Sequence, residues 1–93
     1  MTITDIRFST ATTEDRRRGL LGYVSVVIGN LLRLDGITVR RSRAGRIILS
    51  FPERRDRLGR GHPFMRPIDA LARQEIEQRV LHQIRIPQDE PQS

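Results

Sequence analysis

Arginines just after the middle of the chain form the most concentrated set of residues that could do chemistry with a charged partner. Four guanidinium groups fall within seven residues, at Arg54, Arg55, Arg57 and Arg60. Asp56 supplies the single opposing charge in that stretch. A guanidinium group stays charged and presents a planar fork of N–H donors that matches phosphate oxygens. We therefore expect this segment to contact a phosphate backbone, the alternative being a solvated loop in an arginine-rich protein.

A second basic cluster precedes the first, and no acidic residue lies close to it in the sequence. Its members are Arg40, Arg41, Arg43 and Arg46. If both clusters lie along one edge of the same sheet, their electrostatic fields add into one cationic surface. A solvated turn is the alternative, because the sequence alone does not assign each loop to an edge.

The overall charge suits an anionic partner without selecting one. Seventeen basic residues, all of them arginine, stand against eleven acidic residues, which leaves a net charge of +6. A GC-rich genome would also replace lysine by arginine throughout its proteins, so the positions of the arginines carry more information than their number. No apolar run reaches the roughly 18 residues of a membrane-spanning helix. The first residues lack a secretory signal pattern, and we expect a cytoplasmic protein.

The sequence contains no combination of residues that is typical of an active site. The chain has no cysteine, which removes disulfides, thiolate catalysis and cysteine zinc sites. His62 and His82 lack the spacing of a metal site, and Ser25 lies inside an expected strand without the glycines of a nucleophile elbow. We therefore expect no enzyme, no catalytic residue, no metal, no cofactor and no small-molecule substrate.

Alternating apolar residues predict a small antiparallel sheet of four or five strands. We expect strands at 3–8, at 20–28, from 31 onwards and around 47–51, with a polar segment at 9–19. Phe8 and Phe51 fall at core positions of these strands, so we expect both rings to be buried and no platform for stacking bases.

Two short signals specify the central hairpin of that sheet. Gly29 and Asn30 stand between two apolar runs and predict a tight two-residue turn with positive φ angles. Further along, the apolar positions change from even to odd numbers across Asp35 and Gly36. A strand cannot change faces without an inserted residue, so we expect a β-bulge at this pair.

A C-terminal helix completes the expected α+β fold. Apolar residues recur about every fourth position over 67–85, with Pro67 at the first helical position and Asp69 in the first turn. The preceding segment 52–66 shows no periodicity and is expected to be a basic loop. We expect residues 1–86 to form one nucleic-acid-binding domain and residues 87–93 a disordered polar tail. A chain of 93 residues has a thin core, and we expect it to form a homodimer.

In this order, the elements resemble the SpoVG family of bacterial proteins, the stage V sporulation protein G or septation regulators. The resemblance covers about residues 3–85. The residues that carry it are, in chain order, Ile3 to Arg7, Tyr23 to Val26, Gly36, Ile37, Val39, Phe51, Pro52, Arg54, Arg55, Gly59, Pro67 and Ile68. Asp35 and Arg66 stand where the family often has histidine, so we expect a remote member with a different target sequence.

The resemblance implies a dimeric DNA-binding protein, in some members also RNA-binding, that regulates gene expression or cell division and septation. It places the basic segment of the family on Arg54 and Arg55, with Arg57 and Arg60 close by. The name of the family refers to sporulation, which it does not establish for this chain. Two other classes stay open: an adaptor whose basic surface docks an acidic protein, and an RNA-only or ribosome-associated protein.

Overall fold

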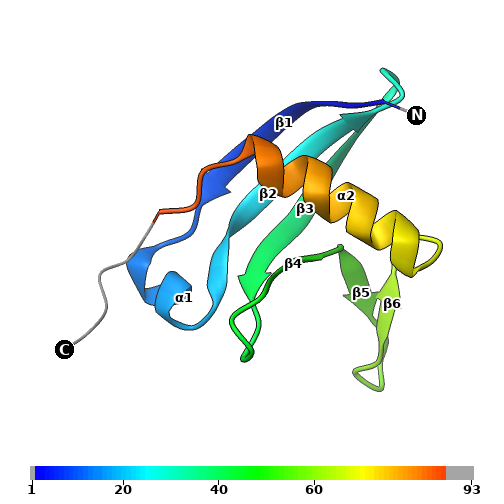
Figure 1. Cartoon of the computed structure of the whole chain (residues 1–93). Coiled ribbons are helices and arrows are strands. Elements are labelled where there is room, and N and C mark those ends of the chain that lie inside the picture. Colours follow the sequence, from blue (N-terminus) through cyan, green and yellow to red (C-terminus); the bar gives the residue numbers. More distant parts are fainter. Residues whose placement is uncertain (1, 88–93) are drawn as a thin grey trace.

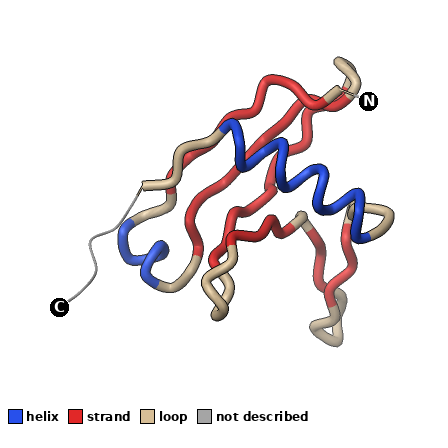
Figure 2. The backbone as a smooth tube through the Cα atoms, viewed as in Figure 1, coloured by secondary structure: helices blue, strands red, loops and turns tan. Residues whose placement is uncertain are grey.

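The computed structural model describes residues 2–87 and consists of two layers. An antiparallel sheet with strand order β1-β2-β3-β4 forms one layer, and helix α2 lies diagonally across one of its faces (Figure 1). A separate two-stranded sheet, β5-β6, projects beyond β4 (Figure 2). The elements are β1 (Ile3–Thr10), α1 (Thr13–Arg17), β2 (Leu20–Ile28), β3 (Leu32–Arg41), β4 (Ile47–Ser50), β5 (Glu53–Arg55), β6 (Gly61–Pro63) and α2 (Ala70–Gln83). This arrangement confirms the predicted α+β fold.

The core lies between the sheet and the C-terminal half of α2. Its fully buried side chains are Leu21, Val24, Val26, Ile37, Val39, Leu49 and Val80. Along β2 and β3 these positions alternate with more exposed ones, as in a sheet with one solvated face. We call the face towards α2 the inner face and the opposite one the outer face. Within residues 2–87, no helix is long and apolar enough to cross a membrane.

The predicted turn between β2 and β3 is confirmed. Gly29 and Asn30 both have φ values of 60°. The N–H of Leu31 donates to the carbonyl of Ile28 at 3.1 Å and closes the turn. Strand β3 begins at Leu32, one residue later than expected.

The predicted bulge is also present. Between Val24 and Val26 of β2, the partner residue on β3 changes from Ile37 to Leu34. The β3 strand therefore contains one residue more than its partner over this interval. Gly36 lies within it and has a φ of 82°, a conformation that glycine adopts without steric cost. The insertion moves the apolar side chains of β3 back onto the inner face.

Helix α2 is shorter than predicted. Asp69 is its N-cap residue and accepts the N–H of Ala72 at 2.8 Å. Pro67 and Asp69 therefore precede the helix instead of forming its first turn, because an aspartate side chain that caps free N–H groups sets the start of the helix. The helix ends at Gln83. The predicted polar tail lies outside the described residues beyond Pro87.

The polar segment between β1 and β2 contains the short helix α1. The hydroxyl of Thr12 accepts the N–H of Asp15 at 3.1 Å and caps its first turn. Glu14 and Arg18 form an ion pair at 3.0 Å across one helical turn. Five residues are too few to show the apolar period that identifies a helix in a sequence.

Candidate nucleic-acid interface

The predicted arginine loop is a β-hairpin, which corrects our expectation of a basic loop without regular structure over 52–66. Strands β5 and β6 pair antiparallel, with Arg54 opposite His62 and Arg55 opposite Gly61. Each strand has three residues, too short for a recognisable alternation of apolar side chains. Because neighbouring side chains of a strand point to opposite sides, the hairpin spreads its arginines over both of its faces.

Asp56 organises the tip of this hairpin. Its Oδ1 atom accepts the N–H groups of Leu58 and Arg60, both at 2.9 Å. Its Oδ2 atom lies 3.2 Å from Nε of Arg60 and 2.8 Å from Nε2 of His62. These contacts, led by the one with His62, hold the pKa of the Asp56 carboxyl below its ordinary value. The charge of Arg60 is therefore partly balanced within the hairpin.

The remaining hairpin arginines differ in whether their side chains have hydrogen-bond or ion-pair partners. Arg55 donates from Nη1 to the carbonyl of Gly59 at 2.8 Å, and its Nη2 atom lies 3.9 Å from Oε1 of Glu53. Arg54 and Arg57 are exposed, and among residues 2–87 their side chains have no hydrogen-bond or ion-pair partner. These two guanidinium groups are the ones in the hairpin that can contact an external anion without first giving up an internal contact.

The second predicted cluster surrounds the turn between β3 and β4. The N–H of Ser42 donates to the carbonyl of Arg46 at 2.8 Å, and the Ser42 hydroxyl accepts the N–H of Arg46 at 3.2 Å. Arg40 and Arg41 end β3, and Arg43 lies in the turn. All four arginine side chains are exposed, and within the described part of the chain none of them forms an ion pair.

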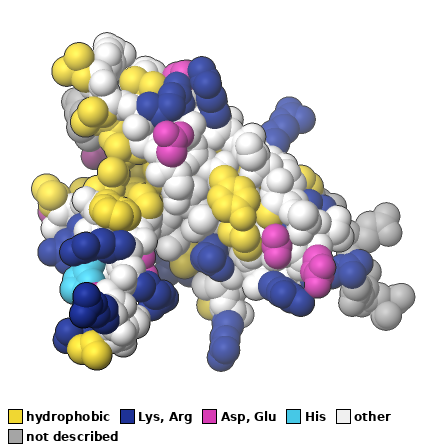
Figure 3. All heavy atoms as spheres, turned by 180° about the vertical axis from the view of Figure 1, so that it is seen from behind, with side chains coloured by type: hydrophobic (Ala, Val, Ile, Leu, Met, Phe, Trp, Pro, Cys, Tyr) yellow, Lys and Arg dark blue, Asp and Glu magenta, His cyan; other side chains and the backbone are white. Residues whose placement is uncertain are grey.

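Both basic segments project towards the same side of the molecule, the lower side in Figure 1. Seen from behind, basic side chains gather along that side (Figure 3). A pocket of about 400 Å³ lies at the β4 edge and is lined by Arg40, Arg66 and Arg73, together with Glu53 at the base of the hairpin. We call this pocket the arginine groove. Among the predicted site residues, Arg40 lines it, and the others extend from the hairpin and the turn.

Sequence reasoning did not select Arg66 and Arg73. Arg73 lies on α2, where its Nη1 atom donates to the carbonyl of Leu49 at 2.9 Å. Its guanidinium carbon also lies 5.6 Å from the centre of the Phe51 ring, within the range of a cation–π contact. Arg66 belongs to the same basic stretch of sequence as the hairpin, which was an available signal. Nothing in the sequence indicated that Arg73 lies against β4.

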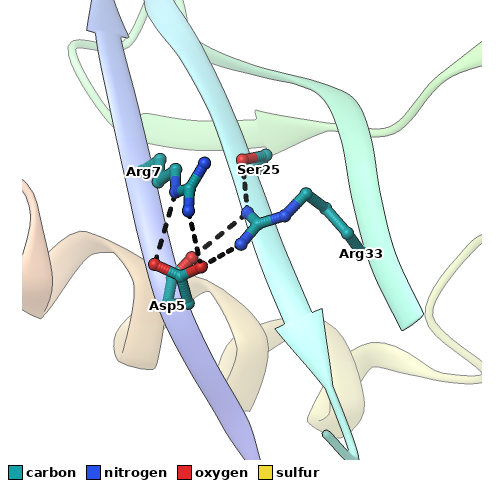
Figure 4. A network of polar contacts seen from close by, with 4 residues as sticks. All are labelled: Asp5, Arg7, Ser25 and Arg33. Atoms are coloured by element: carbon teal, nitrogen blue, oxygen red, sulfur yellow. Dashed lines mark hydrogen bonds and ion pairs between the residues drawn. The ribbon is translucent and has the colours of Figure 1, made fainter. Parts of the chain in front are cut away.

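A separate group of charges lies on the outer face of the sheet (Figure 4). Asp5, in a bulge of β1 with a φ of 46°, binds Nη2 of Arg7 at 3.1 Å and also the guanidinium of Arg33. Arg33 donates in addition to the Ser25 hydroxyl at 2.9 Å. The hydrogen bond from Arg7, with a smaller effect from Arg33, lowers the pKa of the Asp5 carboxyl. These arginines are held by protein groups and lie apart from the predicted interface.

The two histidines lie on different elements, His62 on β6 and His82 on α2. His62 contacts Asp56, and His82 is exposed on α2. Over residues 2–87, no group of three His, Cys, Asp or Glu side chains is placed to hold a metal ion. The chemistry that the arginine groove and the hairpin offer is the binding of anions by guanidinium groups.

Comparison with known proteins connects these features to one family. The SpoVG family model matches residues 1–85, which include every element from β1 to α2. The septation proteins SpoVG of Borreliella burgdorferi, Borreliella afzelii and Borrelia garinii subsp. bavariensis are each 32% identical to this chain over 77 residues. The matched region is 83% of this chain and 78% of each relative.

Proposed function

Because the chain belongs to the SpoVG family, we propose that it is a dimeric, non-enzymatic regulator of gene expression that acts in cell division and septation by binding DNA. The septation role is supported by the family and by the names of the relatives. The DNA-binding role is carried by one observation. Arg54 and Arg57, without partners among residues 2–87, extend from a hairpin whose base lines the arginine groove.

The hairpin has a shape that suits duplex DNA. The major groove of B-DNA is about 12 Å wide and admits a two-stranded β-ribbon. Arg55 and Arg60 are held by contacts within the hairpin and keep its tip in one conformation. Arg54 and Arg57 then contact phosphates of the DNA backbone.

Binding of this kind depends strongly on salt, because each arginine that neutralises a phosphate releases a condensed cation. We assign three phosphate contacts to each protomer, made by Arg40, Arg54 and Arg57. A dimer then makes about six contacts, and the slope of log affinity against log salt concentration is about −5 on duplex DNA. A slope shallower than about −2 would contradict the proposed mechanism.

The dimer is supported by apolar side chains at the N-terminal end of α2. Phe64, Ile68 and Leu71 are 66%, 91% and 76% exposed. An apolar pocket of about 170 Å³ opens nearby, lined in part by Phe51 and Pro67. Large exposed apolar side chains that gather on one surface mark an interaction site, and a chain of this size gains stability by sharing such a surface. We assign a second copy of the chain to this surface, which doubles the number of hairpins that contact DNA.

Substitution of the two free arginines tests the DNA-binding role. The double variant Arg54→Ala, Arg57→Ala should bind duplex DNA at least about tenfold more weakly, while its thermal transition stays nearly unchanged because exposed charges contribute little to stability. The matched control is Arg17→Ala, Arg85→Ala. Arg17 is the last residue of α1 and Arg85 follows the C-terminal end of α2, and both of these helix ends lie away from the β5–β6 hairpin (Figure 1). A folded double variant that binds as tightly as the control would overturn the assignment.

Parallel titrations separate the remaining classes of function. Wild-type protein is titrated with duplex DNA, single-stranded DNA and RNA at one salt concentration. A regulator that acts on DNA binds the duplex. A ribosome-associated protein binds RNA alone, and an adaptor for an acidic protein binds none of the three polymers although it is folded and dimeric.

A further inference from the structure

The outer face of the sheet carries one exposed aromatic ring in its middle. Tyr23 on β2 is 46% exposed, whereas the rings of Phe8 and Phe51 pack against the core. Our expectation that the chain has no ring for stacking bases rested on the two phenylalanines and did not consider Tyr23. On the neighbouring strands, Tyr23 lies opposite Ser9 and Thr38. Thr38 in turn lies opposite Ser50 on β4. Tyr23 therefore belongs to a row of four residues across the four strands. The other three members all carry a hydroxyl group: Ser9, Thr38 and Ser50.

Two arginines lie beside this row, one on each side of the ring. Arg7 is two residues before Ser9 on β1, and Arg40 is two residues after Thr38 on β3. Such diagonal neighbours on one face of a sheet have Cα atoms about 7–8 Å apart, within reach of long side chains. Arg7 is held by Asp5. Arg40 has no side-chain partner among the described residues, and it also lines the arginine groove.

From this arrangement we propose that the outer face binds single-stranded RNA, with an unpaired base stacked on the ring of Tyr23. An exposed aromatic ring on an open sheet can accept the flat face of a base only when that base is not covered by its neighbours in a duplex. Arg40 holds the adjoining phosphate. This inference rests on the proposed nucleic-acid-binding function and adds a second site, used by unpaired nucleotides.

The hydroxyl row favours RNA over DNA at this site. A ribose 2′-OH both donates and accepts hydrogen bonds, and a row of side-chain hydroxyls does the same. Thr38 uses its proton towards the carbonyl of Ser50 at 3.4 Å, which leaves its oxygen lone pairs to accept from a 2′-OH. Arg40 lies between the arginine groove and the outer face of the sheet. An RNA strand that begins in the groove can therefore continue over the β4 edge onto the outer face. Figure 3 shows this face, with hydrophobic side chains near its middle and basic side chains towards its borders.

The composition of the chain makes the inference directly measurable. Tyr23 is the single tyrosine and the chain has no tryptophan, so the intrinsic tyrosine emission of the protein comes from this ring alone. A base stacked on the ring quenches that emission. We expect a twelve-nucleotide oligouridylate to quench it in a saturable manner, and a blunt-ended duplex DNA to bind without quenching.

Variants at the same position provide the second measurement, by anisotropy of a labelled oligonucleotide. Tyr23→Leu should weaken binding of the oligouridylate about fivefold or more, because the stacking ring is lost, and should leave duplex binding unchanged. Tyr23→Phe retains the ring and should bind like wild type. Thr38→Val should weaken RNA binding and leave binding of oligothymidylate unchanged.

The possible results separate this inference from the proposed function. If the oligouridylate binds without quenching and Tyr23→Leu binds it normally, the stacking site is wrong although DNA binding can still hold. Equal affinity for oligothymidylate overturns the assignment to RNA. If duplex DNA fails to bind while the oligouridylate quenches the ring, the proposed DNA-binding function fails and the RNA site stands. Retained quenching in Arg54→Ala, Arg57→Ala would support two separate sites.

Discussion

The carboxylate of Glu77 on α2 accepts the backbone N–H of Leu49 on β4 at 3.0 Å. Arg73, one turn earlier on the helix, donates to the carbonyl of the same residue at 2.9 Å. Strand β4 lies at the edge of the four-stranded sheet, where backbone groups are normally open to pairing with another chain. The helix therefore satisfies both backbone groups of Leu49 with side chains and closes this part of the edge.

Removal of the Glu77 carboxylate should destabilise the fold. Glu77→Ala leaves a partly buried N–H without its charged acceptor, and we expect the free energy of unfolding to fall by about 1–3 kcal/mol. Glu75→Ala is the matched control, since Glu75 forms an exposed ion pair with Arg79 and should change stability by less than about 1 kcal/mol. Urea unfolding followed by circular dichroism measures both. Equal losses would contradict the role given to Glu77.

Position 22 must be a glycine because the surrounding atoms leave no space for a side chain, and not because the backbone there has a positive φ angle. A Cβ atom at Gly22 would lie 2.5 Å from the ring of Phe8 and 2.5 Å from the carbonyl oxygen of Ser9. A backbone oxygen in a paired strand cannot move aside, so Gly22→Ala should lower the free energy of unfolding by about 3 kcal/mol. At Gly45, with a φ of 82° and no atom within 4 Å of the added Cβ, Gly45→Ala should cost only about 1–2 kcal/mol of backbone strain. Thermal unfolding that ranks Gly45→Ala as the worse variant would refute this explanation.

The β2–β3 hairpin could be predicted from the sequence because the residues that specify its turn and its bulge are close together in the chain. Gly29 and Asn30 specify positive φ angles wherever they occur between two strands. The change of apolar parity across Asp35 and Gly36 is likewise independent of the rest of the chain. The predicted helix start at Pro67 is too early. Pro67 and Asp69 are both common near a helix N-terminus, but the N–H of Ala72 donates to the Asp69 carboxylate, which makes Asp69 the N-cap residue.

The remaining features depend on contacts that no short stretch of sequence specifies. The β5–β6 hairpin is organised by Asp56, which contacts Arg60 and His62. Its strands are too short to show an alternation of apolar and polar residues. The sequence therefore indicated only the positive charge of this segment. The arginine groove forms because α2 brings Arg73 against β4, and that placement follows from packing of the helix on the sheet.

The hairpin tip should lose its order at low pH. The pKa of Asp56 is lowered in the folded chain, chiefly by His62 and then by the N–H of Arg60. A carboxyl with a lowered pKa stabilises the fold fully above its ordinary value near 4, and this contribution is lost as pH falls through the lowered value. The amide signals of Leu58 and Arg60, followed by nuclear magnetic resonance, should therefore shift together below about pH 4. In Asp56→Asn the same amides should show no such titration, and identical profiles in the two proteins would contradict this expectation.

The proposed dimer predicts that charge placed on one apolar side chain separates the two copies. Leu71→Glu introduces a carboxylate into the surface at the N-terminal end of α2, and burying it without a partner costs several kcal/mol. We expect the dissociation constant of the dimer to rise at least about a hundredfold. Leu58→Glu is the matched control, since Leu58 and Leu71 are both 76% exposed but Leu58 lies at the hairpin tip. Sedimentation equilibrium should show a monomer for Leu71→Glu and a dimer for wild type and Leu58→Glu. A dimeric Leu71→Glu variant, or a monomeric wild type, would exclude this surface as the dimer interface.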